Sequence, residues 1–531
     1  MPKSEIKFGD YFKLPNPGLR AYFEHVVAGQ PDEYRTPFAK GTQLEDLLDQ
    51  WDTKLRPIAK EWPTLYSFEK DLQSKVGPMS IMKPLRERMA DIDAYYDLIS
   101  EDQTPITTEA IMAVAKEWSS AAGVLMRSEK ATIDTMKKST NSGSPFFTKR
   151  KSVVAETSPC DAWVLNHEVM QTLKGQAWHS AAVLGWRGQE GGPSREDVKQ
   201  RVVWMFPFAI NIKELQVYQP LIAAAQKHLL VPAWVGMDAV DDRITRMFDT
   251  KHPDDYVMCT DFSKFDQHFN PVCQDAALQI LREILVSNED NERWLRNIFP
   301  IKYMIPLAYD WNCVRIGPHG MASGSGGTNA DETLTHRALQ YEAAQSVGSQ
   351  LNPNSQCLGD DGVLTYPGLK VEDVMRSYTA HGLEMNEDKQ YASKLDCVYL
   401  RRWHHRDYRV NGKCVGVYST MRALGRLCEQ ERFYDPEVWG PKMVALRQLS
   451  IIENVKYHPL REEFADFCMK RDKFRLGLDI PGFLDNIVRF ANEAVDYMPD
   501  FLGYTKSLQN DGKPASGIND WWIINYLKSK R

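Results

Sequence analysis

The sequence contains no long apolar run and no closely spaced pair of cysteines. No stretch approaches the roughly 20 apolar residues that a bilayer-spanning helix needs, and the start, MPKSEIKFGDYF, lacks the apolar centre of a signal peptide. We therefore expect a large soluble protein that is not exported. The nine cysteines are scattered from Cys160 to Cys468 without a Cys-x-x-Cys pair, which favours reduced thiols in a cytosolic compartment over disulfides or a zinc site.

Basic residues are not in excess either. The 531 residues include 65 Lys and Arg against 71 Asp and Glu, so the formal net charge is -6. This balance excludes a protein coated in basic surface, and any contact with nucleic acid must come from a local patch or an interior channel. With 43% hydrophobic residues the chain is far beyond one small core, and we expect about two to four domains or subdomains.

Two adjacent acids lie in a turn between apolar flanks. In the segment 355–366, SQCLGDDGVLTY, the turn 359–362 separates two strand-like runs, which predicts a β-hairpin with the carboxylates of Asp360 and Asp361 at an exposed tip. Adjacent acids repel one another unless a cation lies between them, so a divalent metal site is one interpretation. A plain surface turn is the alternative, since such triplets also occur by chance.

A further acid follows a short apolar run. Residues 256–261, YVMCTD, are typical of a buried strand that delivers Asp261 to the edge of a sheet, and Asp266 follows it. The spacing of these two acids is uninformative by itself. Asn270 as N-cap and Pro271 at the first helical position predict a helix whose apolar face belongs to the core.

Basic residues are concentrated in two segments. Residues 127–151 carry seven basic residues against two acids and contain a loop of small residues over 139–146. The backbone of such a loop can approach a phosphate chain closely, although a solvated loop with ordinary lysines is the better interpretation in isolation. Further on, the flexible loop 187–193 and the residues Lys199 and Arg201 precede a predicted strand over 202–208, a basic hairpin suited to a triphosphate.

A glycine-rich stretch precedes a strong helix start. Residues 320–328, GMASGSGGT, are followed by a helical pattern, and Thr328 with Asp331 predicts a capping box. The free amides of a loop that leads into a helix N-terminus suit an anionic ligand. A flexible linker is the alternative, and we favour a loop that faces a substrate. It is not a Walker loop, because no Gly-Lys-Ser/Thr follows.

The last third of the chain is mainly helical. A short strand is predicted over 398–403, and prolines punctuate helical patterns from residue 407 onward, which predicts a separate subdomain. Residues 508–517 are typical of a linker, and the tail beyond them is rich in Trp, Ile and Tyr. We expect this tail to dock on the surface. Insertion of the tail into a cleft is the alternative.

Taken in order, these motifs resemble those of a known family. DFSKFD (261–266), SGSGGT (323–328) and GDD (359–361), preceded by the loop with Arg201 and followed by GLEMNEDK (382–389) and YLRR (399–402), resemble the palm motifs of viral RNA-dependent RNA polymerases, and among them those of picobirnaviruses. The resemblance implies an α+β right-hand polymerase fold that is helix-rich overall. Fingers, palm and thumb then surround an encircled active-site channel, and the palm contains an antiparallel sheet.

The resemblance also implies domain boundaries. We expect an N-terminal arm bridging fingers and thumb over 1–75, fingers over 76–235 and 271–315, palm over 236–270 and 316–405, a thumb over 406–507 and a C-terminal tail over 508–531. Template, nucleotide and duplex then lie in a basic-lined tunnel, while the outside of the protein stays acidic.

Particular residues receive roles from the same resemblance. Asp261, Asp360 and Asp361 are the implied ligands of two Mg²⁺ or Mn²⁺ ions, and Lys389 is the implied general acid to pyrophosphate. The implied nucleotide-binding residues are Arg187, Lys199, Arg201, Asp266, Ser323, Thr328, Asn329 and Glu332. The implied contacts to template and primer are Ser142, Gly143, Ser144, Pro145, Gly324, Arg401, Arg402 and Trp403.

The positions implied in sugar selection depart from the family pattern. Asp266 and Ser323 match residues that monitor the ribose 2′-hydroxyl, but the position four after Thr328, often Asn in relatives, is Glu332. An ionised Glu332 accepts hydrogen bonds and cannot donate them. Asn329 is the alternative donor to Asp266.

The implied function is RNA-templated RNA synthesis by two-metal-ion nucleotidyl transfer, for transcription and replication of a segmented double-stranded RNA genome. Reverse transcription and an inert RNA-binding virion protein with a polymerase-like fold are the alternatives. Asp266 and the Ser323 loop, which match residues that recognise a 2′-hydroxyl, argue against the first, and the presence of all three implied metal-binding acids argues against the second. The implied partners are template RNA, the nascent duplex, NTPs and a viral capsid protein, with no membrane, and we expect a monomer. The implied location is the virion interior, and the host cytoplasm during infection.

Overall fold

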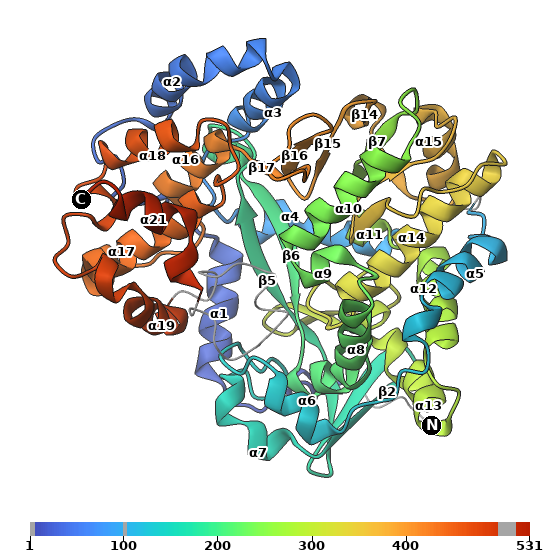
Figure 1. The fold of residues 1–531 in the computed structure, drawn as a ribbon. Helices are drawn as coiled ribbons and strands as arrows, with labels where there is room; N and C mark the ends of the chain where they lie inside the picture. Colours follow the sequence, from blue (N-terminus) through green and yellow to red (C-terminus); the bar gives the residue numbers. More distant parts are fainter. Residues whose placement is uncertain (1–5, 99–102, 498–516) are drawn as a thin grey trace, which may run out of the picture.

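The computed structural model describes residues 6–98, 103–497 and 517–531. Helices surround several small sheets, the C-terminal helices gather on one side, and a long β-hairpin runs through the middle of the molecule (Figure 1). Within these described ranges, no helix combines the length and the apolar character needed to cross a membrane. Residues 498–507 of the expected thumb and 508–516 of the expected tail lie outside the described residues.

The centre of the fold is an antiparallel sheet with the strand order β11-β12-β7-β14. The predicted hairpin is confirmed: Leu358 pairs with Asp361, so Gly359 and Asp360 form a two-residue loop. Thr260 pairs with Gly362 on the neighbouring strand, which puts the acid that follows Thr260 beside this loop. The strands are β7 (Val257–Thr260), β11 (Gln356–Leu358), β12 (Asp361–Thr365) and β14 (Tyr391–Ser393).

Two long helices back this sheet. Helix α12 (Pro271–Ile284) begins as predicted, with the Asn270 side chain accepting hydrogen bonds from two backbone amides of the first turn. Helix α14 (Thr328–Ser346) is buried along most of its length, against α12 and α5 (Thr108–Glu117). The predicted capping box is wrong, because Thr328 Oγ1 donates to the Ala322 carbonyl and the Asp331 side chain is fully buried among donors in the core.

The basic hairpin is also present. Strands β5 (Ala182–Gln189) and β6 (Lys199–Met205) are antiparallel and place Arg187 opposite Arg201. Strand β6 begins and ends three residues earlier than predicted, because helix α8 (Phe208–Lys227) begins directly after Pro207. Strands β9 (Leu307–Asp310) and β10 (Cys313–Arg315) extend the same sheet.

The single strand predicted over 398–403 is in fact two strands. Strand β15 (Asp396–Tyr399) and strand β16 (Arg402–His405) are joined by Leu400 and Arg401, which have φ of +53° and +58°. This tight turn reverses the direction of the chain. Arg401 lies in the turn, and Arg402 begins the next strand. Arg401 and Arg402 therefore lie in different surroundings. Strand β17 (Val417–Tyr418) completes this small sheet.

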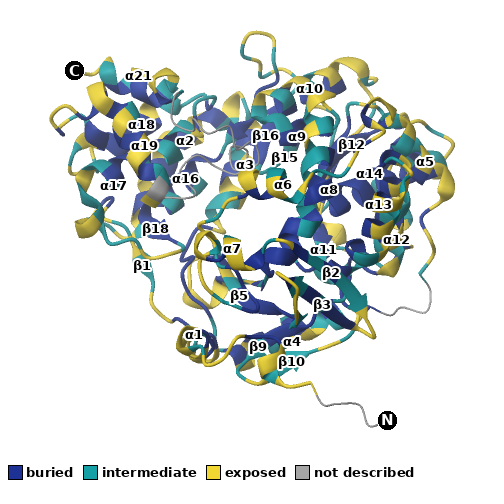
Figure 2. Cartoon of the chain, turned by 90° about the horizontal axis from the view of Figure 1, so that it is seen from below, coloured by how far each residue is buried: buried dark blue, intermediate teal, exposed yellow. Residues whose placement is uncertain are grey.

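The N-terminal segment and the C-terminal helices share one core. Trp51 and Leu55 from α2 (Leu44–Leu55) pack in the same buried cluster as Leu446 and Phe464, and Figure 2 shows these helices lying together. Strand β1 (Tyr34–Arg35) also pairs with β18 (Glu429–Gln430). Both contacts join the first part of the chain to the last.

Within residues 517–531, the tail docks as expected. Helix α21 (Trp522–Lys528) buries Ile523, Ile524 and Leu527, and the Glu453 carboxylate accepts hydrogen bonds from two amides at its N-terminus. Tyr526 Oη donates to Asp466 at 2.6 Å. The ring of Tyr526 is thus engaged on the surface of the C-terminal helices.

All nine cysteines are free thiols, as predicted. The remaining helices and strands are α1 (Pro17–Ala28), α3 (Pro63–Gln73), α4 (Leu85–Asp93), α6 (Glu129–Thr135), α7 (Val154–Thr157), β2 (Cys160–Leu165), β3 (Glu168–Leu173), β4 (Gln176–Ser180), α9 (Pro232–Val235), α10 (Met237–Thr250), β8 (Phe262–Ser263), α11 (Phe265–His268), α13 (Glu289–Asn297), α15 (Val371–Thr379), β13 (Glu384–Met385), α16 (Thr420–Cys428), α17 (Pro436–Glu453), α18 (Arg461–Met469) and α19 (Ile487–Tyr497).

Candidate active site

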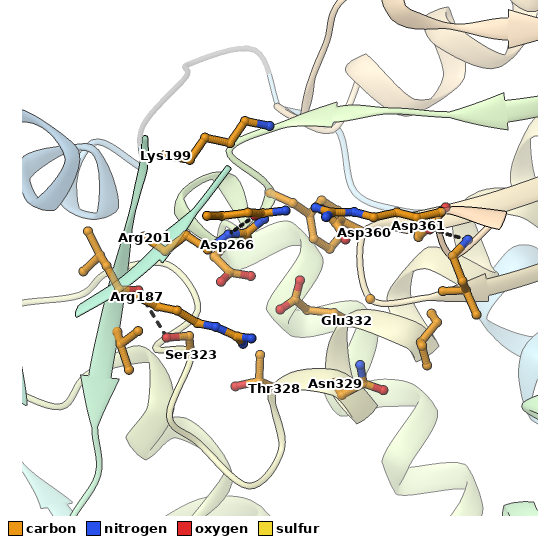
Figure 3. Close-up of a pocket in the computed structure, with 18 of the residues that line it drawn as sticks. Arg187, Lys199, Arg201, Asp266, Ser323, Thr328, Asn329, Glu332, Asp360 and Asp361 are labelled. Carbon is orange, nitrogen blue, oxygen red and sulfur yellow. Dashed lines mark hydrogen bonds between the residues drawn. The ribbon is translucent and has the colours of Figure 1, made fainter. Parts of the chain in front are cut away.

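A large cavity of about 2770 Å³ lies where the central sheet, the β5–β6 hairpin and α16 meet. The side chains labelled in Figure 3 all line it, and they come from stretches that are far apart in the sequence. Lys75 from the N-terminal segment and Arg422 and Arg426 from α16 also line it. The segments that the sequence analysis selected separately thus form one wall.

Two carboxylates face this cavity directly. Asp261 follows β7, and its backbone is held by Gln390, which donates to the Asp261 carbonyl at 2.8 Å and accepts from its amide at 3.0 Å. Asp360 lies in the two-residue loop of the hairpin and is solvent-exposed. It lines the cavity, so the solvent that it meets is the solvent of the cavity. A plain surface turn is therefore excluded at this position.

The surroundings make ionisation of both acids costly. Partial burial raises the pKa of Asp261 above its ordinary value, and the positive charge of Lys389 opposes this rise. The pKa of Asp360 is raised by desolvation, since protein surrounds much of the group, while Arg201 lowers it and the charge of Asp261 raises it further. A bound cation relieves both costs, because it supplies the missing opposite charge.

The third acid, Asp361, is tied to the protein. Its Oδ2 accepts the Leu400 amide at 2.8 Å, and burial, followed by the charge of Asp360, raises its pKa to about 7. In the described part of the chain, no three His, Cys, Asp or Glu side chains are gathered closely enough to enclose a metal ion as they stand. Asp261 and Asp360 nevertheless fit a hard divalent cation, because both offer carboxylate oxygens to the same cavity.

Basic residues line the same cavity. Lys389 ends the short 3-10 helix 387–389 and acts electrostatically on Asp261. Burial lowers the pKa of Lys199, and the nearby charges of Lys75 and Arg401 lower it further. Arg201 Nε donates to Gln189 at 2.7 Å. This concentration of positive charge suits a polyanionic ligand.

Arg187 is the one arginine of this group with an acidic partner in the C-terminal part. Its Nε donates to Glu431 at 3.2 Å, and its side chain is 62% exposed. The residue lines the cavity, and its predicted contact with a nucleotide stays a prediction. An exposed ion pair of this kind contributes little to stability, so Arg187 can exchange Glu431 for a ligand at small cost.

A second pair of acids consists of Asp266 on α11 and Glu332 on α14. The carboxyl groups of Asp266 and Glu332 are hydrogen-bonded to one another, and both line the cavity (Figure 3). Two carboxylates can share a hydrogen bond only if one is protonated. Burial, and next the charge of Asp266, raise the pKa of Glu332 well above its ordinary value, so Glu332 holds the proton and donates.

This hydrogen bond identifies Glu332 as the side chain that donates to Asp266. The sequence left Asn329 as the alternative, but the Asn329 Oδ1 accepts the indole N–H of Trp234 at 2.7 Å. Ser323 lies against β6, where its hydroxyl donates to the Val202 carbonyl at 3.3 Å. Asn329, Ser323 and Thr328 all line the cavity.

The glycine-rich loop lies very close to the backbone of β6. A Cβ atom at Gly324 would lie 1.6 Å from the Trp204 carbonyl oxygen, so only glycine fits there. Gly324 also lines the cavity, in agreement with its predicted place. The loop 323–328 is therefore fixed by close packing, unlike a free linker.

The centre of the small-residue loop, where template contacts are predicted, is buried. Ser142 and Ser144 are each 2% exposed and do not line the cavity. Ser144 Oγ donates to the Tyr11 carbonyl at 2.6 Å, and Ser142 Oγ accepts the Thr148 amide at 3.0 Å. Their hydroxyls are committed to holding the loop.

Gly143 and Pro145 also lie outside the cavity lining. A Cβ at Gly143 would lie 2.9 Å from the Phe206 carbonyl oxygen, and the Pro145 carbonyl accepts the Lys13 amide at 3.0 Å. The neighbouring residues Asn141 and Arg150 line the cavity instead. The sequence identified the right loop, but the small size of residues 142–145 serves packing rather than access.

The three residues of the segment 401–403 lie in different parts of the protein. Arg401 lines the cavity. Arg402 makes two hydrogen bonds to the Asp241 carboxylate, at 3.0 and 3.1 Å, inside the protein. Trp403 is fully buried, and its indole donates to Thr64. Of these three predicted primer contacts, Arg401 lines the cavity, whereas Arg402 and Trp403 lie in the core because the turn at 400–401 reverses the chain.

The sequence analysis missed several cavity residues. Gln390, which holds Asp261, lies next to the predicted Lys389 and could have been found by proximity. Lys75, Arg422 and Arg426 come from segments that only tertiary packing brings to the cavity. No periodicity or motif marks them.

The chain matches known proteins over almost its whole length. Residues 89–415 match the family described as viral RNA-dependent RNA polymerase. A protein named potential RNA-dependent RNA polymerase, from a human picobirnavirus (strain Human/Thailand/Hy005102/-), is 66% identical over 525 residues, which cover 98% of each chain.

Solved structures give the same result. The crystal structure of the RNA-dependent RNA polymerase of a human picobirnavirus is 65% identical and superposes with a TM-score of 0.95, covering 98% of both chains. An insertion-loop deletion mutant of such a polymerase gives 62% identity and a TM-score of 0.92 over 98% of both chains. The predicted α+β right-hand polymerase fold is thereby confirmed, and the chain, an RNA-directed RNA polymerase, belongs to the family of viral RNA-dependent RNA polymerases.

Proposed function

We propose that this polymerase extends RNA by two-metal-ion nucleotidyl transfer in the cavity, with Asp261 and Asp360 as the principal metal ligands. The observation that carries the proposal is that Asp261 and Asp360 present their carboxylates to the same cavity that Lys389, Lys199 and Arg201 line. Asp361 has an assisting role in metal binding, because one of its carboxylate oxygens already accepts a hydrogen bond from the Leu400 amide. Mg²⁺ or Mn²⁺ bound there supplies activation of the primer 3′-hydroxyl and charge neutralisation at the pyrophosphate.

The basic wall orients the triphosphate. Arg201 and Lys199 lie on one strand of the β5–β6 hairpin, and Arg187 lies opposite Arg201 on the other. Arginine guanidinium groups bind phosphate oxygens in a bidentate manner, whereas lysine acts as a point charge. Lys389 faces the leaving group and donates a proton to pyrophosphate. Asp261, held in place by Gln390, keeps its carboxylate directed toward the reacting atoms.

Sugar selection rests on the Asp266–Glu332 pair. Because Glu332 holds the proton, Asp266 remains the acceptor, and its second oxygen accepts the ribose 2′-hydroxyl. A deoxyribose lacks this donor and leaves a partly buried carboxylate unpaired, which costs binding free energy. The Ser323 hydroxyl and the amide of Asn329 line the same part of the cavity.

Template and product RNA occupy the rest of the cavity. Arg150, Asn141 and Arg401 line it, and they replace the buried residues of their segments as RNA contacts. We also propose the domain boundaries stated above, and the pairing of β1 with β18 supports an N-terminal arm that bridges to the thumb. The similarity to picobirnavirus proteins supports transcription and replication of a segmented double-stranded RNA genome by a monomer inside the capsid, in the host cytoplasm during infection.

The proposal is tested by incubating the purified protein with a single-stranded RNA template, Mg²⁺ or Mn²⁺, and either NTPs or dNTPs. We expect template-length RNA from NTPs only, and none from the Asp360→Ala variant. Comparable incorporation of dNTPs on RNA would support reverse transcription instead. Unaltered synthesis by Asp360→Ala refutes the assignment of the metal ligands.

A further inference from the structure

The loop that carries Asp360 is attached to helix α14 at one residue, Gly359. The Gly359 amide donates to Thr333 Oγ1 at 2.9 Å, and the Gly359 carbonyl lies 2.8 Å from His336 Nδ1. Thr333 and His336 are one turn apart on the same face of α14, so both backbone groups of this one glycine are bound by adjacent turns of a single helix.

The direction of the second hydrogen bond follows from chemistry. A carbonyl oxygen only accepts, so His336 Nδ1 carries the hydrogen and donates. Burial lowers the pKa of His336 to about 4, and the ring is neutral near pH 7. His336 therefore serves as a fixed donor at this position, and no charge from it reaches the neighbouring carboxylates.

Packing fixes the imidazole itself. The ring is enclosed by the aromatic rings of Phe262, Phe265 and Tyr378. On its remaining side, a Cβ at Gly362 would lie 2.6 Å from the ring. The glycine after Asp361 thus leaves room for the histidine, and the glycine before Asp360 receives its hydrogen bond. The ring cannot turn without displacing the hairpin.

Helix α14 also begins at the nucleotide side of the cavity. Thr328, Asn329 and Glu332 precede Thr333 directly on this helix and line the cavity. The sugar-facing side chains and the attachment of the hairpin loop therefore belong to one rigid element. Position errors of about 1 Å in a reacting group lower rates strongly, so such an attachment has a functional consequence.

We propose that Thr333 and His336 are positioning residues that hold the Asp360 loop in the geometry needed for metal binding. This inference rests on the proposed function of Asp360 as a metal ligand. The two residues touch neither substrate nor metal; they act through the backbone of Gly359. Without them the hairpin remains paired to β7, but the loop that presents Asp360 loses its attachment to α14.

Two matched pairs of variants test the proposal. Thr333→Val and His336→Leu remove the hydrogen bond and keep approximate size, whereas Thr333→Ser and His336→Asn retain an acceptor and a donor at the same places. Binding of Mn²⁺ alone is measured by electron paramagnetic resonance of the free ion, with thermal melting of each variant and the KM for NTP measured alongside.

We expect the Mn²⁺ midpoint to rise by about tenfold in Thr333→Val and His336→Leu, the change that corresponds to roughly one buried hydrogen bond. In the Ser and Asn variants it stays within about twofold of wild type, and the KM for NTP changes little in all four. Because Thr and Val have almost the same volume, Thr333→Val decides the question if His336→Leu folds poorly.

Suppose that Thr333→Val and His336→Leu bind Mn²⁺ with the wild-type midpoint while Asp360→Ala no longer binds it. This result overturns the positioning role of Thr333 and His336 and leaves Asp360 as a metal ligand. Unchanged Mn²⁺ binding in Asp360→Ala overturns the metal assignment, and the positioning role with it. Equal loss in the valine and serine variants also contradicts the proposal, because the hydroxyl acceptor is then irrelevant.

Discussion

Asp331 on α14 and Asp360 in the hairpin loop both lie near Glu332, and their carboxylates have opposite surroundings. Asp331, in the first turns of α14, is fully buried and accepts hydrogen bonds from Tyr218 and Tyr303, each at 2.7 Å, and from Lys302 at 3.0 Å. Asp360 faces the cavity, and Arg201 and Asp261 act on it only through space.

These two aspartates show that the surroundings of a carboxylate decide whether it stabilises the fold or binds a ligand. A buried carboxylate whose acceptor sites are filled by protein donors maintains the fold, and removal of one partner leaves an uncompensated buried charge. A carboxylate whose oxygens remain uncommitted contributes little to stability and is available to a ligand. The predictions below test this division, from the largest expected effect to the smallest.

The first prediction concerns Asp261→Asn. We expect synthesis to fall by about 10³-fold or more, roughly 4 kcal/mol in transition-state stabilisation, because a neutral amide is a poor ligand for a hard cation. The free energy of unfolding should change by less than about 0.5 kcal/mol, since no folded-state ion pair is lost. Primer extension and urea denaturation measure the two quantities, and a large loss of stability would argue for a structural role.

The second prediction concerns the buried pair of Asp241 and Arg402, whose side chains meet at 3.0 Å. We expect Asp241→Ala to cost about 3–5 kcal/mol of unfolding free energy, because Arg402 is left buried without its partner. The double variant Asp241→Leu with Arg402→Met should recover a good part of the loss, since neither charge remains. A cost below about 1 kcal/mol in the single variant, by urea denaturation, contradicts the structural assignment.

The third prediction is a pH dependence at Glu69, which joins the N-terminal segment to α16. Its carboxylate accepts the Thr420 amide at 2.7 Å, yet burial raises its pKa from 4.5 to about 7. A raised carboxyl pKa in the folded state stabilises the protein below the unfolded pKa, and this stability is lost as pH rises through the folded pKa. The loss amounts to at most about 3 kcal/mol.

We therefore expect Glu69→Gln to gain stability relative to wild type as the pH rises from about 5 to about 8. The matched control is Glu283→Gln, because Glu283 is exposed and should show no such trend. Chemical denaturation at a series of pH values measures the difference. A constant difference between Glu69→Gln and wild type across this range means that the folded protein does not hold the Glu69 proton.

The fourth prediction has the smallest effect. We expect Glu332→Gln to retain the preference for NTP over dNTP within about threefold, because a neutral glutamic acid and a glutamine both donate to Asp266. Glu332→Ala should lower the preference by about tenfold, since Asp266 loses its donor. Competitive incorporation of NTP and dNTP measures this ratio. Loss of the preference in Glu332→Gln would show that the Glu332 side chain works as an anion.

Local patterns in the sequence predicted the central elements. The apolar run before Asp261, the Asp-Gly turn and the N-cap at Asn270 are local signals, and the structure confirms all of them. The three acids that we propose as metal ligands were identified from these elements together with the family resemblance. Their common cavity wall agrees with both.

Contacts between distant segments were beyond prediction. The turn at Leu400 and Arg401 separates two arginines that look equivalent in sequence, and only tertiary pairing decides which faces the cavity. Likewise, the capping box expected at Thr328 fails because the buried Lys302 provides Asp331 with a stronger partner. The proton on Glu332 depends on burial beside Asp266, which the sequence does not reveal.

The most direct test compares Asp360→Asn with Asp331→Asn in one experiment, by measuring the rate of RNA synthesis per folded molecule on one RNA template. Our account predicts that Asp360→Asn folds like the wild type and makes no product, whereas Asp331→Asn is markedly less stable and its folded fraction still copies RNA. Synthesis by folded Asp360→Asn at the wild-type rate would contradict the account.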